Sequence, residues 1–443
     1  MSLSRYAEYK DSGVEWLGEV PAHWEIRRLS CLAQILSGYP FDASLFGFEG
    51  IPVIRMSDFV GGHVRREDAK RAEHAPTEAM AETDDILLGL SGSISNFAIV
   101  KAQDLPVAVN QRVAIVRKLN ERLGILPWLL QSQEFAQQII ADLPATTILN
   151  ISMGQLRQCR FSLPTTEVEQ TAIATFLDRE TAKIDGLIAE QENLIALLAE
   201  KRQATISHAV TKGLNPAAPM TDSGVAWLGE VPAHWDIRTI AKATTKITNG
   251  YVGPTRDILI EEGIPYVQAT HIKGGCVNFG HDYFVSNEWS NAHAKSILEE
   301  GDVLIVQTGA GTGDVGLVSS NEAGFNCHAL IILSRDKSIL HGSYLSALLQ
   351  SAYGRAKLTS IQTGAMHPHL NCGEVKFVEI PLPSLKGQAE IISFLDTETT
   401  SLDALTAEAT RGIALLKERR SALISAAVTG KIDVRHLAEA EAA

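Results

Sequence analysis

The segment DSGVEWLGEVPAHWEIR at residues 11–27 returns as DSGVAWLGEVPAHWDIR at residues 222–238. Fifteen of the 17 positions are identical at a constant offset of 211, and only Glu15/Ala226 and Glu25/Asp236 differ. A match of this quality between distant parts of one chain indicates an internal duplication, which must be recognised before a fold is assigned. We name these two stretches the leading segments.

A second repeated block follows each long middle section. LPTTEVEQTAIATFLDRETAKID at 163–185 matches LPSLKGQAEIISFLDTETTSLD at 382–403, and LLAEKRQATISHAVTKG at 197–213 matches LLKERRSALISAAVTGK at 415–431. From Gln170 and Gln388 onward the offset is a steady 218. Pro164 and Pro383 open these blocks and good helix formers fill them, so each block predicts one long helix, the first from about Glu167 to Thr211.

Apolar residues in the two blocks recur at spacings of three, four or seven, which is typical of a coiled-coil seam. They are Ile173, Leu177, Ile184, Leu187, Leu194 and Leu198 in the first block, and Ile391, Leu395, Leu402, Leu405 and Leu416 in the second. Gln191 and Gly412 interrupt the stripe, and Ile188, Ile195 and Ile413 widen it. Two unrelated surface helices are the alternative. If the stripes pair, chain order makes the helices antiparallel and relates the two middle sections by an approximate two-fold axis.

The middle sections, about 30–160 and 240–380, share only an outline. GIPVIRMSD at 50–58 corresponds to GIPYVQATH at 263–271, and DILLGLSGSISNFAIV at 85–100 to DVLIVQTGAGTGDVGLV at 302–318. VNQRVAIV at 109–116 aligns with NCHALIIL at 326–333. Short β-branched runs punctuated by glycine predict mixed, β-rich domains. The expected fold class is therefore α+β, with two β-rich domains separated by two long antiparallel helices.

Composition narrows the possible functions. Apolar residues make up 45% of the 443 residues and charged residues 21%, which are ordinary globular values. No apolar run is long enough for a membrane span or a secretory signal, so we expect a cytoplasmic protein. The five scattered cysteines suggest neither disulfides nor a zinc site and are expected to be buried. The net charge of −13 argues against tight DNA binding by the chain alone.

The leading segments, the LP-to-FLD helix starts and the Ala-Val-Thr helix ends together resemble the specificity subunit of type I restriction-modification systems. The resemblance covers the whole chain. The one departure is TKG at 211–213, where the second copy has TGK at 429–431.

The resemblance implies target-recognition domains at 1–163 and 214–382 and helical spacers at 164–213 and 383–443. It also implies that each recognition domain reads one half of a bipartite DNA site, while the helices set the gap and bind two modification subunits. Restriction subunits complete such a complex. S-adenosylmethionine, ATP and magnesium are expected on the partner subunits, and no cofactor, metal or catalytic residue is expected in this chain.

Two motifs could be mistaken for catalytic or metal sites. GTGDVG at 311–316 fits a dinucleotide-binding pattern, but the residues after it do not read as a helix, so we expect a glycine-rich hairpin loop. His367 and His369 lack a partner at a recognisable metal-ligand spacing. A methyltransferase would need an Asn/Asp-Pro-Pro-aromatic tetrapeptide, and the chain has no Pro-Pro pair.

Base readout requires polar side chains held at loop tips in the major groove. We expect these where the two copies keep the framework and exchange the polar residue. The first-domain candidates are Arg55, Ser57, Ser91, Ser93, Asn96, Gln111, Arg112 and Asn150. The second-domain candidates are Gln268, Thr270, His271, Thr308, Thr312, His328, His367 and His369. For each residue taken singly, a solvated or capping role is the alternative.

The tryptophans of the leading segments, Trp16, Trp24, Trp227 and Trp235, could stack on bases. Because they are identical in both copies, whereas base-reading residues should differ, we expect them to pack against the helices.

Two other functions are weighed against DNA recognition. One is a scaffold that binds two identical partners through its repeated helices without DNA, which the acidic charge favours. The other is a stand-alone methyltransferase or nuclease, which the absence of a cofactor loop disfavours.

Overall fold

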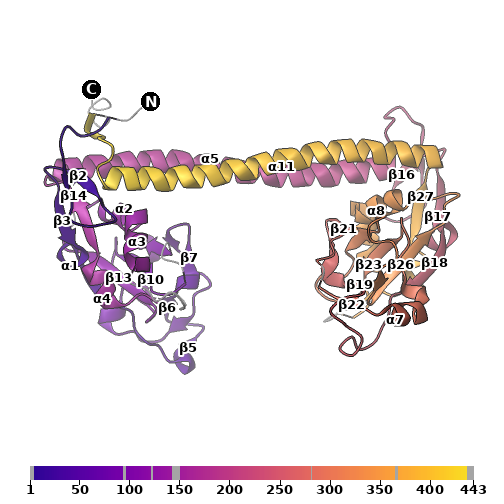
Figure 1. Ribbon diagram of the computed structural model, residues 1–443, viewed down its shortest axis with the longest axis horizontal. Helices are drawn as coiled ribbons and strands as arrows, with labels where there is room; N and C mark the ends of the chain where they lie inside the picture. Colours follow the sequence, from indigo (N-terminus) through magenta and orange to yellow (C-terminus); the bar gives the residue numbers. More distant parts are fainter. Residues whose placement is uncertain are drawn as a thin grey trace. The chain divides into compact units, whose positions relative to one another are not determined.

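The computed structural model describes residues 4–92, 96–120, 123–141, 150–280, 282–364 and 368–436, with the side chain of residue 45 excepted. The chain forms two compact units (Figure 1). Unit 1 comprises Met1–Gln191 and Arg411–Ala443, and unit 2 comprises Glu192–Thr410. The boundary between the units cuts both long helices, so each unit holds the start of one helix and the end of the other.

The two predicted long helices are confirmed as α5 (Glu167–Lys212) and α11 (Leu385–Val428). Thr166 and Ser384 stand at equivalent positions before them, and their hydroxyl groups accept hydrogen bonds from main-chain N–H groups three residues on. Gly213 (φ +76°) and Gly430 (φ +72°) follow the two helix ends in left-handed backbone conformations, which glycine adopts readily. The TKG/TGK difference therefore shifts the terminating glycine by one residue, and both helices still end at a glycine in the left-handed conformation.

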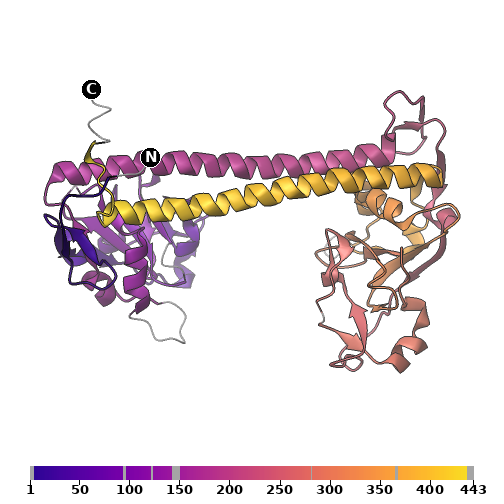
Figure 2. The same ribbon diagram turned by 45° about the horizontal axis from the view of Figure 1, so that its top comes forward.

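Within each unit the two helices lie side by side and run antiparallel (Figure 2). In unit 1, Arg420 Nε lies 2.9 Å from Asp185 Oδ1, and in unit 2, Arg202 Nε lies 3.3 Å from Asp403 Oδ1. Arg202 follows Asp185 along α5, whereas Asp403 precedes Arg420 along α11. The antiparallel arrangement expected from the stripes is thus present in both units.

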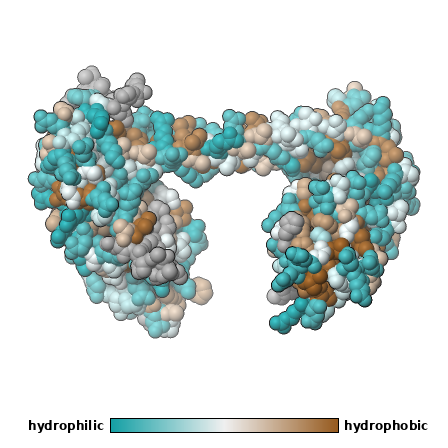
Figure 3. Space-filling model, viewed as in Figure 1, coloured by the Kyte–Doolittle hydropathy of each residue, from teal (hydrophilic) through white to brown (hydrophobic). Residues whose placement is uncertain are grey.

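The predicted seam is wrong in the middle of the helices. Leu187, Leu194 and Leu405 are 46%, 41% and 47% exposed. The more buried positions are Ile184, Ile188, Gln191, Ile195 and Leu198, which alternate in steps of four and three. Leucines at heptad spacing also occur outside the contact face. Only contact with the neighbouring helix distinguishes the apolar residues of the seam from the exposed ones. Apolar residues are accordingly visible among hydrophilic ones along the helices (Figure 3).

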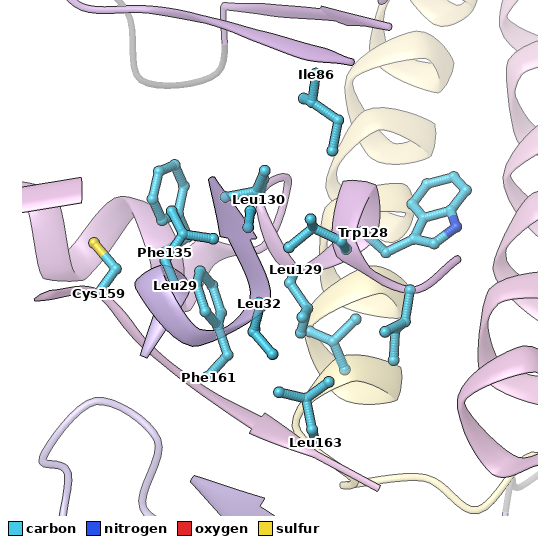
Figure 4. Close-up of a cluster of buried hydrophobic side chains, with 14 of the residues drawn as sticks. Leu29, Leu32, Ile86, Trp128, Leu129, Leu130, Phe135, Cys159, Phe161 and Leu163 are labelled. Atoms are coloured by element: carbon cyan, nitrogen blue, oxygen red, sulfur yellow. The ribbon is translucent and has the colours of Figure 1, made fainter. Parts of the chain in front are cut away.

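The core of each β-rich domain is completed by the long helices. In unit 1 the end of α11 contributes Ile424, Ala427 and Val428, and the start of α5 contributes Ile173 and Leu177. In unit 2 the residues one repeat away do the same, namely Ile206, Ala209, Val210, Ile391 and Leu395. Figure 4 shows part of the unit 1 core, where the ring of Phe135 lies beside that of Phe161, with ring centroids 6.0 Å apart. Each domain is therefore anchored on the last turns of one helix and the first turns of the other.

The largest sheet has the same strand order in both units. In unit 1 the order is β4 (Ala33–Ser37), β13 (Val113–Lys118), β10 (Ile86–Gly89), β11 (Phe97–Ile99), β8 (His63–Val64) and β7 (Phe59–Val60). In unit 2 it is β18 (Thr244–Asn249), β26 (Leu330–Arg335), β23 (Val303–Val306), β24 (Val315–Leu317), β21 (Gly275–Val277) and β20 (Ile272–Lys273). Among the described strands of each sheet, only the β11–β8 or β24–β21 pairing is parallel.

A smaller sheet lies beside each large one. It is formed by β12 (Ala108–Val109), β6 (Ile51–Ile54), β9 (Arg71–Ala72) and β5 (Phe46–Gly47) in unit 1. In unit 2 it is formed by β22 (Phe284–Val285), β19 (Ile264–Val267) and β25 (Asn326–Cys327). The two domains are thus mixed and β-rich, as the sequence predicts.

Shorter elements complete the two units. Two-stranded sheets pair β1 (Tyr9–Asp11) with β2 (Glu19–Pro21), β3 (Glu25–Arg28) with β14 (Arg160–Leu163), β15 (Met220–Asp222) with β16 (Glu230–Pro232), and β17 (Asp236–Thr239) with β27 (Glu379–Leu382). The short helices are α1 (Leu29–Leu32), α2 (Leu126–Leu129), α3 (Gln133–Ala141), α4 (Met153–Gln158), α6 (Ile240–Ala243), α7 (Asn287–Ala292), α8 (Gly342–Gln350), α9 (Ala352–Ser360) and α10 (Cys372–Val375). The 3-10 turns are η1 (Ala43–Leu45), η2 (Met56–Asp58), η3 (Thr77–Ala79), η4 (Ala102–Asp104), η5 (Ala269–His271) and η6 (Ala294–Ser296).

The predicted packing of the leading-segment tryptophans against the helices holds for Trp24 and Trp235, whereas Trp16 packs within its own leading segment. Trp24 is fully buried and donates from Nε1 to Glu169 Oε1 at 3.0 Å, Trp235 is 9% exposed, and Trp16 is half-buried. The prediction is wrong for Trp227, which is 64% exposed. Its backbone adopts φ +69°, a left-handed conformation that Trp16 does not share, and the Lys357 ammonium lies 5.7 Å from the ring centroid.

Two other expectations concern the cysteines and membrane insertion. Cys159 and Cys327 are buried as predicted and Cys372 is partly buried, but Cys31 and Cys276 are exposed. The prediction is therefore wrong for these two, because they lie on the outward side of the short elements α1 and β21. In the part of the chain that the structure describes, no helix is both long and apolar enough to cross a membrane.

Candidate nucleic-acid interface

In each unit, most candidate base-reading residues that the structure describes lie at one end of the large sheet. In unit 1 this end is formed where β4 and β10 finish and β13 begins, and in unit 2 where β18 and β23 finish and β26 begins. We call it the sheet-end surface. It comprises residues 38–39, 55–57, 91–92, 96, 110–112 and 150 in unit 1, and residues 250–251, 268–270, 307–314, 328–329 and 368–369 in unit 2.

Met56 contacts two of the candidates in unit 1. Asn96 Nδ2 donates to the Met56 carbonyl oxygen at 3.2 Å, and Ser91 Oγ lies 3.6 Å from Met56 Sδ. Ser91 also forms an isolated antiparallel bridge with Asn150. Ser91 is buried and Asn150 exposed, so only Asn150 of this pair has the loop-tip position that the sequence predicts.

The other candidates of unit 1 expose their side chains from anchored backbone. The Arg55 N–H donates to Asp58 Oδ2 at 2.8 Å, and Ser57 Oγ donates to Asp58 Oδ1 at 3.1 Å. The Gln111 N–H donates to the carbonyl oxygen of Tyr39 at 3.0 Å, and Arg112 is exposed next to it. Fixed backbone with outward polar side chains is the arrangement that direct readout requires.

The equivalent turn in unit 2 departs from the prediction at one residue. Gln268 is half-buried and Thr270 is exposed, but His271 is 5% exposed. Its Nδ1 accepts a hydrogen bond from the Gln268 N–H at 3.0 Å, which is the role of Asp58 in unit 1. Burial lowers the pKa of His271, with a smaller opposing effect of Asp282. His271 is therefore a capping residue of the turn and does not lie at a loop tip.

Thr308, Thr312 and His369 lie close together in unit 2. Thr308 and His369 form an isolated antiparallel bridge that corresponds to the Ser91–Asn150 bridge of unit 1. Thr312 Oγ1 donates to the carbonyl oxygens of Gly309 (2.7 Å) and Pro368 (3.2 Å). These contacts hold the loop between β23 and β24, an antiparallel pair, so GTGDVG lies in a hairpin as predicted.

The sequence alignment pairs His328 with Gln111, which is one position away from the residue that the structure places opposite His328. Tyr39 forms an isolated parallel bridge with Asn110, and Tyr251 forms the same bridge with His328. Asn110 is thus the structural equivalent of His328, and the turn of unit 1 is one residue longer. Turn lengths are not encoded in the strand pattern, so only hydrogen-bond register reveals this equivalence. Ser93 and His367 lie outside the described residues.

A basic cavity adjoins the sheet-end surface of unit 2. It has a volume of about 420 Å³ and is lined by Arg202, Lys273 and Arg355 together with Gly313 and Asp314 of the hairpin loop. Three cationic side chains around one concavity suit contact with a phosphate backbone. Among the residues that the structure describes, no group of three or more His, Cys, Asp or Glu side chains is arranged to hold a metal ion.

Comparison with known proteins gives consistent matches along the chain. The family model described as "Type I restriction modification DNA specificity domain" matches residues 21–196 and 235–413. The specificity subunit of the type I restriction enzyme EcoBI from Escherichia coli is 22% identical over 441 residues, which cover 98% of this chain and 91% of that protein. The StySPI specificity subunit of Salmonella potsdam is 24% identical over 208 residues, covering 46% of this chain and 44% of that protein.

A solved structure from work titled "Structural basis underlying complex assembly and conformational transition of the type I R-M system" has the same fold. It aligns with a TM-score of 0.65 and 18% identity, covering 92% of this chain and 98% of that chain. The likeness supports the architecture of two β-rich domains and two long helices.

Proposed function

Because the chain belongs to the family of type I restriction modification DNA specificity domains, we propose that each sheet-end surface reads one half of a bipartite DNA site. The family membership confirms the predicted role as a DNA-recognition subunit of a type I restriction-modification system. The division into two half-sites, the gap and the identity of the partners extend this role and are part of the proposal.

The observation that carries the proposal is the contrast between what the two units repeat and what they change. The contacts between domain and helix recur one repeat apart: Ser425 Oγ accepts from the Gln133 N–H, and Ser207 Oγ accepts from the Ala352 N–H. At the sheet-end surfaces the framework recurs while the side chains differ, as with Asn150 and His369. Two readers of different sequences on one common support are expected to show this contrast.

The long helices have two roles in the proposal. They set the distance between the half-sites, and their repeated surfaces bind two modification subunits, with restriction subunits completing the complex. S-adenosylmethionine, ATP and magnesium belong to those partners. The partners also supply positive charge that this chain, at −13, lacks. We place this activity in the cytoplasm, where the DNA target would be.

Matched insertions in the two helices test the spacing role. Seven residues added after Glu190 in α5 and after Ile413 in α11 keep the seam in register and lengthen the pair by about 10 Å. Methylation mapping of DNA from cells that express the complete system should then show unchanged half-sites and a longer gap, by up to about three base pairs. The same seven residues inserted after Pro216, in the loop between α5 and β15, should leave the gap unchanged. Altered half-sites with an unchanged gap would contradict the proposal.

DNA binding by the assembled complex separates this proposal from a DNA-free scaffold. The chain purified with its modification subunits should bind duplex DNA with an affinity that falls steeply as salt rises, because phosphate contacts release counterions. Charge reversal at Lys273 and Arg355 in the basic cavity should weaken binding to all sequences alike. Complete absence of binding at low salt would favour the scaffold.

A further inference from the structure

The turn before β13 in unit 1 contains one residue that has no counterpart in unit 2. Two main-chain hydrogen bonds close this turn. The Gln111 N–H donates to the carbonyl oxygen of Tyr39 at 3.0 Å, and the Gly38 N–H donates to the carbonyl oxygen of Val113 at 3.0 Å. Gly38 and Tyr39 are consecutive, whereas Arg112 separates Gln111 from Val113. One side of the turn therefore carries an extra residue, and that residue is Arg112.

The same two hydrogen bonds occur in unit 2 without the extra residue. The Ala329 N–H donates to the carbonyl oxygen of Tyr251 at 2.9 Å, and the Gly250 N–H donates to the carbonyl oxygen of Leu330 at 2.8 Å. Ala329 and Leu330 are consecutive. The shorter turn closes with Ala329 at φ +46°, a left-handed conformation that is unfavourable for alanine, whereas none of residues 110–112 has a positive φ. The two turns thus differ in length and in backbone conformation.

The main chain of Arg112 is held on both sides. Its N–H donates to Asn110 Oδ1 at 3.4 Å, and its carbonyl oxygen accepts from the Leu90 N–H at 2.9 Å. A Cβ on Gly38 would overlap the main-chain carbonyl of Asn110, so the two sides of the turn are in close contact. An extra residue in one strand acts as a β-bulge, which redirects a side chain and is frequent beside binding sites. The turn therefore presents the Arg112 side chain from a fixed backbone.

The guanidinium group of Arg112 is unpaired. The residue is exposed, and within the described ranges no hydrogen bond or ion pair involves its side chain. Arg55, the other arginine of the sheet-end surface in unit 1, differs because its Nε lies 3.5 Å from Asp58 Oδ2. A guanidinium group is a planar fork of N–H donors without an acceptor. Its ligand must therefore offer acceptors, and two acceptors side by side fit it best.

We propose that Arg112 is a specificity-determining residue of unit 1 that donates to O6 and N7 of one guanine. Guanine presents these two acceptors side by side in the major groove, whereas adenine presents one acceptor and one amino donor. Phosphate is the other acceptor that DNA offers to arginine, but phosphate contacts carry no sequence information and are common to both half-sites. A residue that only one of two equivalent turns contains fits the part of the target that differs. The inference rests on the proposed reading of one half-site by unit 1.

Methylation mapping with two variants of Arg112 tests the inference. Cells express the full chain with its modification subunits, and the methylated motif is determined for wild type, Arg112→Ala and Arg112→Gln. With Arg112→Ala, the preference for one guanine in one half-site should fall about tenfold, while the other half-site is unchanged. Arg112→Gln should shift the preference at that position from guanine toward adenine, because a glutamine amide matches the acceptor and the donor of adenine.

A modified base tests the contact directly. Duplex DNA is prepared with a guanine analogue that has carbon in place of N7 at the position identified by mapping. The wild-type complex should bind this DNA more weakly than unmodified DNA, because one acceptor is lost. The Arg112→Ala complex should bind both duplexes with equal affinity. If Arg112→Ala instead weakened binding to all sequences alike, Arg112 would contact phosphate, and the inference would be wrong.

Arg28 provides a matched control. It is also an exposed arginine of unit 1, but it lies on β3 before the start of β4, whereas the sheet-end surface lies where β4 finishes. Arg28→Ala should leave the motif unchanged. An unchanged motif with Arg112→Ala in an active complex would overturn the inference. Failure of the proposed function looks different: exchanging residues 30–160 for those of a relative with another target would leave the motif unchanged.

Discussion

Arg420 and Asp185 form an ion pair at 2.9 Å in unit 1, and Arg202 and Asp403 form the equivalent pair at 3.3 Å in unit 2. Asp185 and Asp403 occupy matching positions of the two sequence repeats, and so do Arg202 and Arg420. Each pair joins the N-terminal part of one long helix to the C-terminal part of the other. The structural unit of the molecule is therefore assembled from two sequence repeats, and neither repeat contains a complete unit by itself.

The two ion pairs should contribute little and equally to stability. The side chains of Arg420 and Asp185 are 27% and 51% exposed, and exposed pairs typically contribute below about 1 kcal/mol. A double-mutant cycle on Arg420→Ala and Asp185→Ala, followed by urea unfolding, should give a coupling free energy of about 0.5 kcal/mol that decreases at high salt. The same cycle on Arg202 and Asp403 serves as the internal comparison. A coupling free energy several times larger in one unit than in the other would contradict their equivalence.

The hydrogen bonds that Ser425 and Ser207 of the long helices accept from the two β-rich domains should also contribute equally to stability. Ser425 Oγ accepts from the N–H of Gln133 at 3.1 Å, and Ser207 Oγ accepts from the N–H of Ala352 at 2.9 Å, both at the first residue of a short helix. Replacing either serine with alanine leaves a helix N–H without its partner, at a cost of about 1 kcal/mol. Hydrogen exchange should rise in α3 for Ser425→Ala and in α9 for Ser207→Ala. Exchange that rises in both short helices with either variant would contradict this assignment.

Substitution by alanine should change the free energy of unfolding in opposite directions at two glycines, one inside α11 and one just after its end. Gly430 has φ +72°, and a Cβ there would overlap the ring of Pro21 and lie 3.2 Å from Trp24. Gly430→Ala should lower the free energy of unfolding of unit 1 by about 2 kcal/mol or more. Gly412 lies inside α11, and nothing lies within 4 Å of the position of its Cβ. Gly412→Ala should raise stability by about 0.5–1 kcal/mol. Thermal unfolding of both variants checks the pair.

Acid should destabilise unit 2 through His271. Burial holds the pKa of this histidine below its ordinary value of 6.5. The unfolded chain therefore takes up the proton first, and the stabilisation present above pH 6.5 is lost as the pH falls below that value. His271→Asn keeps an acceptor for the Gln268 N–H and should flatten the decline in unfolding free energy between about pH 7 and pH 5.5. His208, exposed on α5, provides the control variant His208→Asn. An unchanged pH dependence in His271→Asn would contradict the prediction.

The candidate site was predictable as a region but not residue by residue. The rule that base readers lie where the copies share a framework and differ in polar residues led to Asn150 and His369, which the structure places at corresponding positions, and to the exposed Thr308. It also selected Ser91 and His271, which are buried, and it missed Asn110. Burial and turn length depend on contacts with neighbouring strands, and a pattern of polar residues along the chain does not contain that information.

The repeat in the sequence determined the two long helices, the two β-rich domains and their α+β class, because helix propensity, proline punctuation and strand alternation are local properties. Tertiary structure alone decided which stripe of each helix forms the seam and which helix end completes each core. It also decided that Asn110 is the counterpart of His328, because each residue forms a parallel bridge with the tyrosine of a distant turn, Tyr39 or Tyr251. These features arise from packing partners distant in sequence, so they appear only when the chain is folded.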